Sequence, residues 1–301
     1  MHQALSIPVV DVFVADVDAN AAGTFMVPKS HRLKTPRVES SEAEYAEALL
    51  NLSLDKKIKL IFPLMDFELE VLSKWRELFE EKGIKVVVSD NLFINTTLNK
   101  DNFQIAMEKN GYCLPQHLNE GAHNISVDKD FILKKVRGSG SVGLREIHAK
   151  MGSNLIVDSG YIAQEKIFGQ EYGLDILNDL EGNYLHCCLK RKISMRSGET
   201  DQATVIPVSP EVLALSRQIS RDFRHVGNLD IDFIITDEGK IYLIDFNPRF
   251  GGGYAFTQAA GNNYLRAMVD CFLGRKPVFV EITKSVNAAK GVSVFGRENE
   301  D

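Results

Sequence analysis

Three carboxylates and an amide occur close together in two apolar segments near the end of the chain. The segments read NLDIDFIIT and IYLIDFN, and a turn around Gly239 joins them. A four-residue loop in that turn would place Asp232 opposite Asp245. Two residues further from the turn, Asp230 would lie opposite Asn247. Because opposed residues of a hairpin share a face, this spacing predicts one strongly polar surface.

Such a surface needs a cation. Two carboxylates about 4 Å apart repel each other by about 4 kcal/mol at an effective dielectric of about 20, so an ordinary hairpin avoids this arrangement. Oxygen ligands of this kind suit Mg²⁺, which also binds phosphates. Asp232, Asp245 and Asn247 are therefore the predicted metal ligands, for Mg²⁺ or alternatively Mn²⁺. A register one residue off would instead separate the two aspartates and leave a simple solvated hairpin.

The rest of this hairpin fits the same interpretation. Arg249, two residues after Asn247, could offer a planar fork to phosphate oxygens. The opposite face would carry apolar residues that pack in the core, which we expect to be Leu229, Ile231, Phe233, Ile244 and Phe246. Gly251–Gly253 would let the backbone approach an acceptor substrate.

A second polar motif lies in FILKKVRGSGSVGLREI, residues 131–147, where a strand runs into a glycine-rich segment. Glycines and serines in such a loop expose backbone N–H groups to phosphate oxygens, and a lysine just before them can reach the same phosphates. Adjacent strand residues point to opposite faces, so only one of Lys134 and Lys135 can do so. The alternative is a flexible hairpin loop with solvated lysines.

Composition sets limits on function. The chain has 301 residues, of which 44% are hydrophobic and 25% charged, with a net charge of −6. No cluster of Lys and Arg predicts a nucleic-acid partner, and no apolar stretch of about 18 residues predicts a membrane span. The four cysteines lack metal-binding spacing. We therefore expect a cytoplasmic protein with reduced thiols and no nucleic-acid or membrane partner.

Alternation of strands and helices predicts the organisation of the chain. Residues 1–98 alternate short apolar strands with helices, which indicates a parallel, Rossmann-like sheet. Ligands bind at the carboxyl ends of such strands, so Asp66 and Glu68 could face a ligand or simply cap the next helix. We predict two further regions, residues 99–170 with the glycine-rich loop and residues 171–301 with the polar hairpin.

Several short motifs in order resemble the ATP-grasp superfamily, and most of all relatives of the carbamoyl-phosphate synthase large subunit. The motifs are Asn99-Lys100-Asp101, the loop from Lys134 to Gly143, the segment from Gln164 to Tyr172, the segment from Arg191 to Glu199, and Asp245-Phe246-Asn247-Pro248-Arg249. The resemblance implies an α/β fold with α+β lobes, in which a truncated Rossmann-like domain precedes the ATP-grasp lobes. The usual first strand and its glycine turn are missing from the sequence.

The resemblance also implies a role for each matching residue. ATP-binding residues would be Lys100, Lys134, Ser139, Gly140, Ser141, Glu165, Ile167 and Glu171, with the serines and glycine in a lid, Glu165 and Ile167 at adenine and Glu171 at the ribose. Residues at the reacting phosphate would be Lys134, Arg191 and Arg249. Two positions depart from the family pattern: Lys135 replaces a proline, and both metal acids are the shorter Asp.

The implied activity is an ATP- and Mg²⁺-dependent ligase that releases ADP and phosphate. A small carboxylate, bicarbonate or carbamate would become an acylphosphate, which an amine or ammonia attacks. The implied partners are these small substrates, and a homodimer is one assembly that the resemblance allows. Two alternatives are an ATP-binding subunit or sensor without complete ligase activity, and a structural α/β protein without a nucleotide site.

Overall fold

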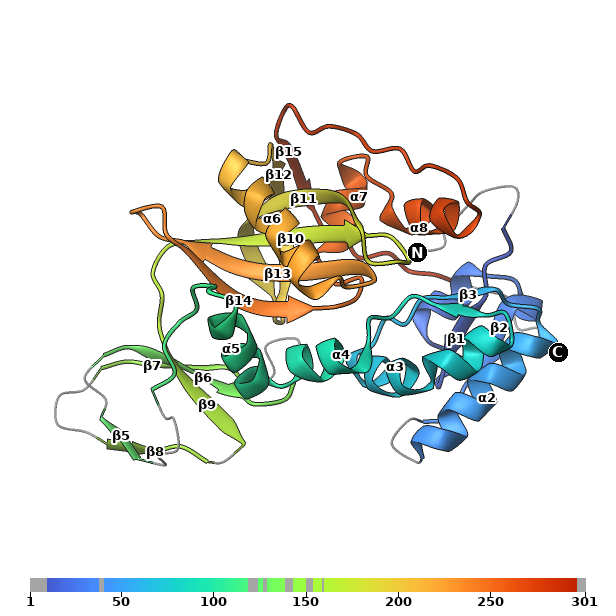
Figure 1. Ribbon diagram of the computed structural model, residues 1–301, viewed down its shortest axis with the longest axis horizontal. Coiled ribbons are helices and arrows are strands. Elements are labelled where there is room, and N and C mark those ends of the chain that lie inside the picture. Colours follow the sequence, from blue (N-terminus) through green and yellow to red (C-terminus); the bar gives the residue numbers. More distant parts are fainter. Residues whose placement is uncertain are drawn as a thin grey trace.

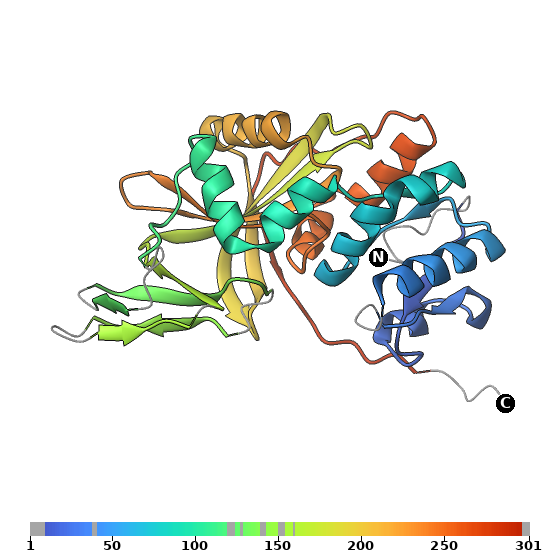
Figure 2. The ribbon, with the colours of Figure 1, turned by 60° about the horizontal axis from the view of Figure 1, so that its bottom comes forward.

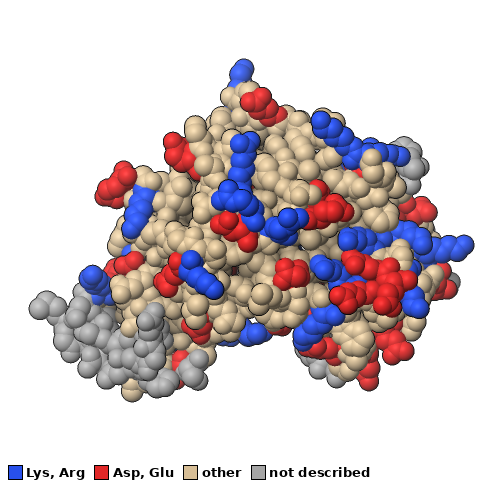
Figure 3. All heavy atoms as spheres, viewed as in Figure 1, with Lys and Arg blue, Asp and Glu red and all other residues tan. Residues whose placement is uncertain are grey.

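The computed structural model describes residues 10–37, 41–118, 124–126, 129–138, 143–149, 154–158 and 160–296. An N-terminal group of helices and short strands lies beside a large antiparallel sheet, and a small β-lobe projects from the other end (Figures 1 and 2). No helix among these residues is both long and apolar enough to cross a membrane. Acidic and basic side chains are interspersed on the face seen in Figure 3.

The N-terminal part contains two separate parallel strand pairs instead of the single sheet expected from the sequence. The pairs are β1 (Val14–Asp16) with β2 (Arg32–Lys34), and β3 (Leu60–Ile61) with β4 (Lys85–Val86). The helices are η1 (Ala22–Met26), η2 (Lys29–His31), α2 (Glu42–Asp55), α3 (Asp66–Glu81) and α4 (Asn91–Leu98). The apolar faces of α2, α3 and α4 pack together with β4 in one core.

The small β-lobe follows helix α5 (Lys100–Lys109), which begins at Asn99, whose side chain accepts hydrogen bonds from the N–H groups of Asp101 and Asn102. Its strands are β5 (Asn124–Ser126), β6 (Phe131–Lys135), β7 (Arg145–Ile147), β8 (Asn154–Ile156) and β9 (Tyr161–Glu165). β6 lies between β7 and β9, both antiparallel to it. The backbone N–H of Lys100 donates a hydrogen bond to the carbonyl of Val136, just beyond β6. This hydrogen bond fixes the start of α5 against the small β-lobe.

The large sheet has the strand order β14-β13-β10-β11-β12-β15, all antiparallel. The strands are β10 (Gln170–Asn178), β11 (Tyr184–Arg196), β12 (Glu199–Ile206), β13 (Gly227–Ile235), β14 (Ile241–Asn247) and β15 (Val286–Ala289). One face packs against α5 and α6 (Pro210–Phe223). The other face packs, over its apolar part, against α7 (Tyr254–Ala259) and α8 (Tyr264–Phe272).

The β13–β14 hairpin has the predicted pairs Asp232–Asp245 and Asp230–Asn247, but not the predicted loop. Near the turn, Ile235 pairs with Ile241, one residue off the expected register, and a bulge between Asp232 and Phe233 restores it. A bulge adds one residue to one strand. As a result Leu243, not Ile244, takes the buried place opposite Phe233.

The division of the chain into three domains remains a proposal, and its two boundaries can be placed among these elements. The boundary after residue 98 falls between α4 and α5, where Leu98 ends one helix and Asn99 caps the next. The boundary after residue 170 falls at the start of β10. We retain 1–98, 99–170 and 171–301 as the proposed units.

Candidate active site

The polar face of the β13–β14 hairpin is the centre of the candidate site, and each of its acids faces a lysine. The distances between side-chain nitrogen and oxygen are 3.4 Å for Lys190–Asp230, 2.7 Å for Lys192–Asp232 and 4.0 Å for Lys100–Asp245. The side chain of Asn247 donates a long hydrogen bond of 3.5 Å to the carbonyl of Asp230. Three lysines from two parts of the chain therefore converge on the acidic face.

A cavity of about 160 Å³ lies over this face. Its lining combines the hairpin acids with residues from the neighbouring strands and from the glycine-rich segment after β14. The main contributors are Glu171, Lys190, Lys192, Asp230, Asp232, Asp245, Asn247, Arg249, Gly252 and Phe256. The cavity is thus mostly polar, with carboxylates on its floor and cations beside them.

The structure distinguishes the two adjacent lysines of β6. Lys134 lies near the charges of Asp245, Lys100 and Asp232, whereas Lys135 is exposed and its stem lies below Gly138 and Gly143. Burial lowers the pKa of Lys134, Asp245 opposes the shift, and the like charge of Lys100 adds to it. Lys134 is therefore the lysine on the site side of β6.

Of the other predicted ATP-binding residues, Glu171 lines the cavity. Lys100 donates to the carbonyl of Gly138 at 3.2 Å, and Glu171 pairs with Lys192 at 2.7 Å. Glu165 ends β9, where its carboxylate accepts a 3.1 Å hydrogen bond from the Gln116 N–H, and Ile167 lies in the link to β10. Ser139, Gly140 and Ser141 lie outside the described residues.

Arg191 is not brought to the cavity. It pairs with Tyr172 in β10, whereas Lys190 pairs with Gly173. Successive strand residues point to opposite faces, so Arg191 lies on the face away from the hairpin acids and is exposed. Lys190 and Lys192, which flank it, occupy the positions facing the site. Lys190 and Lys192 are two positions apart in the segment KRK, so a strand places both on one face. This spacing was the signal that could have identified them.

Lys190 and Asp175 form a buried ion pair beneath the cavity. Their side-chain atoms lie 2.6 Å apart, with exposures of only 3% and 0%. Asn228 and Thr257 also donate to the carboxylate of Asp175. Burial disfavours the charged amine, but Asp175 and Asp230 outweigh it and raise the pKa of Lys190, which therefore remains protonated. This ion pair therefore fixes the ammonium group of Lys190 directly below the acidic face.

We expect Lys190→Met to lower the free energy of unfolding by about 3–5 kcal/mol, because it leaves the charge of Asp175 buried without a partner. Urea denaturation measures this change. Adding Asp175→Asn should recover part of the loss. As a control, Lys290→Met removes the exposed pair with Glu199 and should cost no more than about 1 kcal/mol. Equal losses in Lys190→Met and Lys290→Met would contradict this assignment.

The glycine-rich segment after β14 passes very close to the site's own side chains. A Cβ atom at Gly251 would lie 2.0 Å from Oδ2 of Asp230, and one at Gly253 would lie 3.2 Å from Nζ of Lys190. We expected these glycines to admit an acceptor substrate. In the structure they lie against Asp230 and Lys190, and the approach to an acceptor substrate stays a prediction.

Gly251→Ala should therefore displace Asp230. We expect ATP-dependent turnover to fall by about 10- to 100-fold, since small displacements in a reacting site have effects of this size. Steady-state kinetics of ADP release measures the effect. Gly160→Ala is the control, because a Cβ atom there meets nothing within 4 Å. A Gly251→Ala variant as active as Gly160→Ala would show that Asp230 can move without consequence.

The residues of the hairpin face fit a bound Mg²⁺. Asp232 and Asp245 are opposed, Asn247 follows two positions along β14, and all three supply the hard oxygen donors that Mg²⁺ prefers. Burial raises the pKa of Asp232 to about 6, although Lys192 opposes the shift, and the charge of Asp230 adds to it. Burial and the charge of Asp230 thus disfavour the charged form of Asp232, and a bound divalent cation would favour it.

Arg249 reaches the cavity from the end of β14 and is held by the N-terminal part of the chain. Its Nε donates to Oδ1 of Asp66 at 2.5 Å, and both side chains are largely buried. Burial opposes the charge of Arg249, yet the hydrogen bond that it donates to Asp66 raises the pKa of the guanidinium. Sequence reasoning named both residues but did not connect them, since 183 positions separate them.

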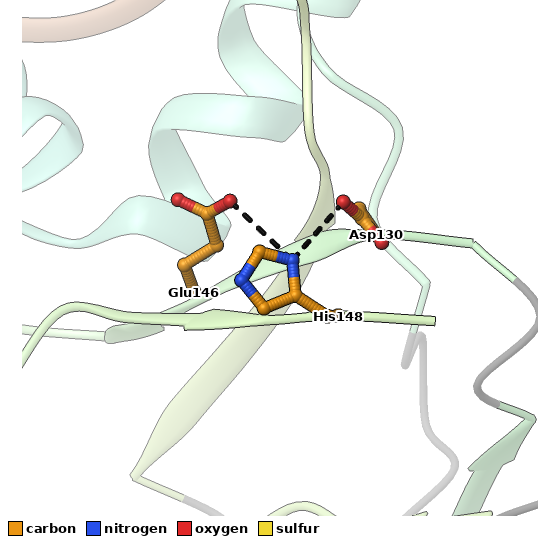
Figure 4. A group of neighbouring side chains, drawn as sticks. All are labelled: Asp130, Glu146 and His148. Atoms are coloured by element: carbon orange, nitrogen blue, oxygen red, sulfur yellow. Dashed lines mark hydrogen bonds and ion pairs between the residues drawn. The ribbon is translucent and has the colours of Figure 1, made fainter. Parts of the chain in front are cut away.

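A second group with metal-ligand chemistry lies on the small β-lobe, in Asp130, Glu146 and His148 (Figure 4). One nitrogen, Nδ1 of His148, faces both carboxylates, at 3.3 Å from Asp130 and 3.7 Å from Glu146. Lys166 contacts Glu146, and the N–H of Ala149 donates to Asp130 at 2.7 Å. This arrangement is an ion-pair network at the surface of the small lobe, where exposed acidic groups are common without an ion, and we assign no metal to it.

A family model described as an ATP-grasp domain matches residues 97–253, just over half of the chain. The chain belongs to the ATP-grasp family. A second model, described as a PylC-like N-terminal domain, matches residues 1–87. These matches confirm the predicted fold class, with ATP-grasp lobes behind an N-terminal domain, and the prediction of an ATP-dependent enzyme. No significant match was found among curated proteins.

Solved structures share this ATP-grasp fold at low sequence identity. Pyruvate carboxylase of Rhizobium etli matches with a TM-score of 0.64 and 16% identity, over 86% of this chain. The biotin carboxylase domain of 2-oxoglutarate carboxylase from Hydrogenobacter thermophilus was solved in complex with MgADP and bicarbonate. It matches with a TM-score of 0.65 and 15% identity, over 91% of this chain. An L-amino acid ligase from Bacillus licheniformis matches with a TM-score of 0.60 and 15% identity, over 79% of this chain.

This ATP-grasp chain spans only part of those proteins. It covers 26% of the pyruvate carboxylase, 67% of the biotin carboxylase domain and 61% of the L-amino acid ligase. The likeness therefore concerns the fold, and the substrates of these proteins enter only as support for a proposal.

Proposed function

We propose that this chain uses ATP and Mg²⁺ to convert a small carboxylate into an acylphosphate, which an amine or ammonia then attacks. The observation that carries the proposal is the cross-strand pair Asp232–Asp245, with Asn247 beside it, on the floor of a cavity that cations surround. The Hydrogenobacter domain with MgADP and bicarbonate supports the nucleotide, the metal and an acid of this size. The amino acid ligase supports an amine acceptor.

In this proposal, the residues around the cavity bind and orient the reactants. Asp232, Asp245 and Asn247 would hold Mg²⁺, which when bound neutralises phosphate charge and orients the phosphates for transfer. Lys100 and Lys134 lie near Asp245 and would attract the phosphate oxygens. Arg249 would stabilise the charge of the transferred phosphoryl group through its planar fork.

The first chemical step would be an in-line displacement at the γ-phosphorus. A carboxylate oxygen of the substrate forms a bond to phosphorus, the bond to the bridging oxygen breaks, and ADP leaves with that electron pair. In the second step, the amine nitrogen bonds to the acyl carbon, inorganic phosphate leaves, and the nitrogen loses a proton. Bicarbonate or carbamate in place of the carboxylate would give a reaction like that of carbamoyl-phosphate synthase. No side-chain nucleophile is needed.

The experiment that tests this proposal is a screen of carboxylates for stimulated ADP release, with hydroxylamine as a general trap for acylphosphates. We expect at least one small carboxylate to accelerate ADP release and to yield a hydroxamate. Nucleotide binding without stimulation by any acid would favour an ATP-binding subunit or sensor. Failure to bind nucleotide would contradict both functions.

A further inference from the structure

Two acids on one face of α3 contact arginines from the part of the chain that carries the proposed site. Oδ1 of Asp66 accepts a hydrogen bond from Arg249 at 2.5 Å, and Oε1 of Glu70 accepts one from Arg137 at 2.7 Å. Residues four apart on a helix share a face. The N-terminal part therefore touches both the hairpin end and the segment that follows β6.

Asp66 is not required where the sequence first suggested a role for it, as a helix cap. Glu68 does that work, because its Oε2 accepts from the N–H groups of Leu64 and Met65, both at 3.4 Å. The other oxygen of Glu68 accepts from the buried hydroxyl of Tyr45 at 2.5 Å. The carboxylate of Asp66, at the start of the helix where negative charge is favoured, is left to bind Arg249.

The contact uses only one edge of the guanidinium of Arg249. Within the described part of the chain, the bond from Nε to Asp66 is the one side-chain hydrogen bond recorded for Arg249. Arginine has five N–H donors in a rigid plane, so the four on Nη1 and Nη2 remain for an oxygen ligand. Arg249 also lines the cavity. A fixed Nε therefore fixes the orientation of the edge that would meet phosphate oxygens.

A second contact stabilises the same junction. Phe62, in the loop that leads to α3, packs edge-on against Phe250, with ring centroids 6.1 Å apart. The N-terminal part thus contacts Phe250, the residue next to Arg249, as well as the side chain of Arg249. Both contacts connect the N-terminal part to the end of β14.

We propose that Asp66 is a positioning residue, which holds the guanidinium of Arg249 in the orientation that phosphoryl transfer needs. This inference rests on the proposed function, in which Arg249 meets the transferred group. It gives the N-terminal part a place in the reaction, although none of its residues would touch ATP through this contact. Preorganised donors of this kind act without reorganisation during the reaction.

Kinetics of Asp66→Ala, Arg249→Ala and the double variant test the proposal. We expect Asp66→Ala to lower kcat by about 10- to 100-fold, while KM for MgATP changes by less than about 3-fold because other groups bind the nucleotide. If Asp66 acts through Arg249, Asp66→Ala should have no further effect in the Arg249→Ala background. Asp66→Asn, which keeps an acceptor oxygen, should retain more activity than Asp66→Ala.

A matched control removes a different ion pair of the same helix. Glu42→Gln breaks the exposed contact of Glu42 with Lys74 on α3 and should leave kcat unchanged. Because Asp66→Ala leaves the largely buried guanidinium of Arg249 without its partner, thermal unfolding is measured first, and kcat is compared at a temperature at which both variants are folded. A loss of kcat in Asp66→Ala that adds fully to the loss in Arg249→Ala would overturn the positioning role.

A measurement independent of activity separates this inference from the proposed function. The Nε–Hε nuclear magnetic resonance signal of Arg249, assigned by its absence in Arg249→Lys, should shift in Asp66→Ala and not in Glu42→Gln. An unchanged signal in Asp66→Ala would overturn the inference even if the enzyme is active. A wild-type protein that releases no ADP would contradict the proposed function, and the Arg249 signal would still decide whether Asp66 holds the guanidinium.

Discussion

We expect Lys134→Met to slow ATP-dependent ADP release by about 100- to 1,000-fold, the usual effect of removing one charge-stabilising donor from a reacting site. Lys134 lies on the side of β6 that faces Asp245 and Asp232, whose charges favour its ammonium form against the effect of burial. Methionine keeps the length of the side chain and removes only the ammonium. Steady-state measurement of ADP release gives the effect directly.

Lys135 provides the matched control for this variant. It is the next residue on the same strand, exposed and on the opposite face. Lys135→Gln keeps the aliphatic stem that lies below Gly138 and Gly143, so its activity should remain within about 3-fold of the wild type. Equal losses in the two variants would mean that β6 contributes general positive charge and not one directed contact.

Asp245→Asn should lower turnover still further, by about 1,000-fold or more, which corresponds to about 4 kcal/mol of lost transition-state stabilisation. The change keeps the size of the side chain but removes one of two opposed charges that would hold Mg²⁺. Raising the Mg²⁺ concentration should recover part of the activity, because part of the loss comes from weaker binding of the ion. Kinetics at several Mg²⁺ concentrations measures both effects.

Asp237→Asn is the control for Asp245→Asn, since Asp237 lies in the exposed turn of the same hairpin. It removes the same charge from the same two strands, away from the cavity. We expect its turnover and its dependence on Mg²⁺ to match those of the wild type. If both variants lose activity alike, net charge and not a metal ligand would explain the effect.

Local periodicity accounts for what could be predicted. Alternation with period two placed Asp232 opposite Asp245 and Asp230 opposite Asn247, and the structure has these pairs. The bulge that restores their register could not be foreseen, because it depends on which of Leu243 and Ile244 fills the core against Phe233. Local signals also explain helix α6, since Ser209 caps it and Pro210 favours its first turn.

Contacts between distant parts of the chain account for most of what the sequence could not show. The pairing of Asp66 with Arg249 and of Asp175 with Lys190 depends on how the N-terminal part and three sheet strands come together. The family resemblance also implied a role for Arg191 and none for its neighbours. The pairing of β11 with β10 decided in favour of Lys190 and Lys192.

The most direct test of the account is calorimetric titration of a non-hydrolysable ATP analogue into the wild-type protein, with Mg²⁺ and with a chelator in its place. We predict binding that depends on Mg²⁺ and is strongly weakened in Asp245→Asn but not in Asp237→Asn. Binding of equal strength with and without Mg²⁺, or no binding at all, would contradict the claim that the face of Asp232, Asp245 and Asn247 binds a metal–nucleotide complex.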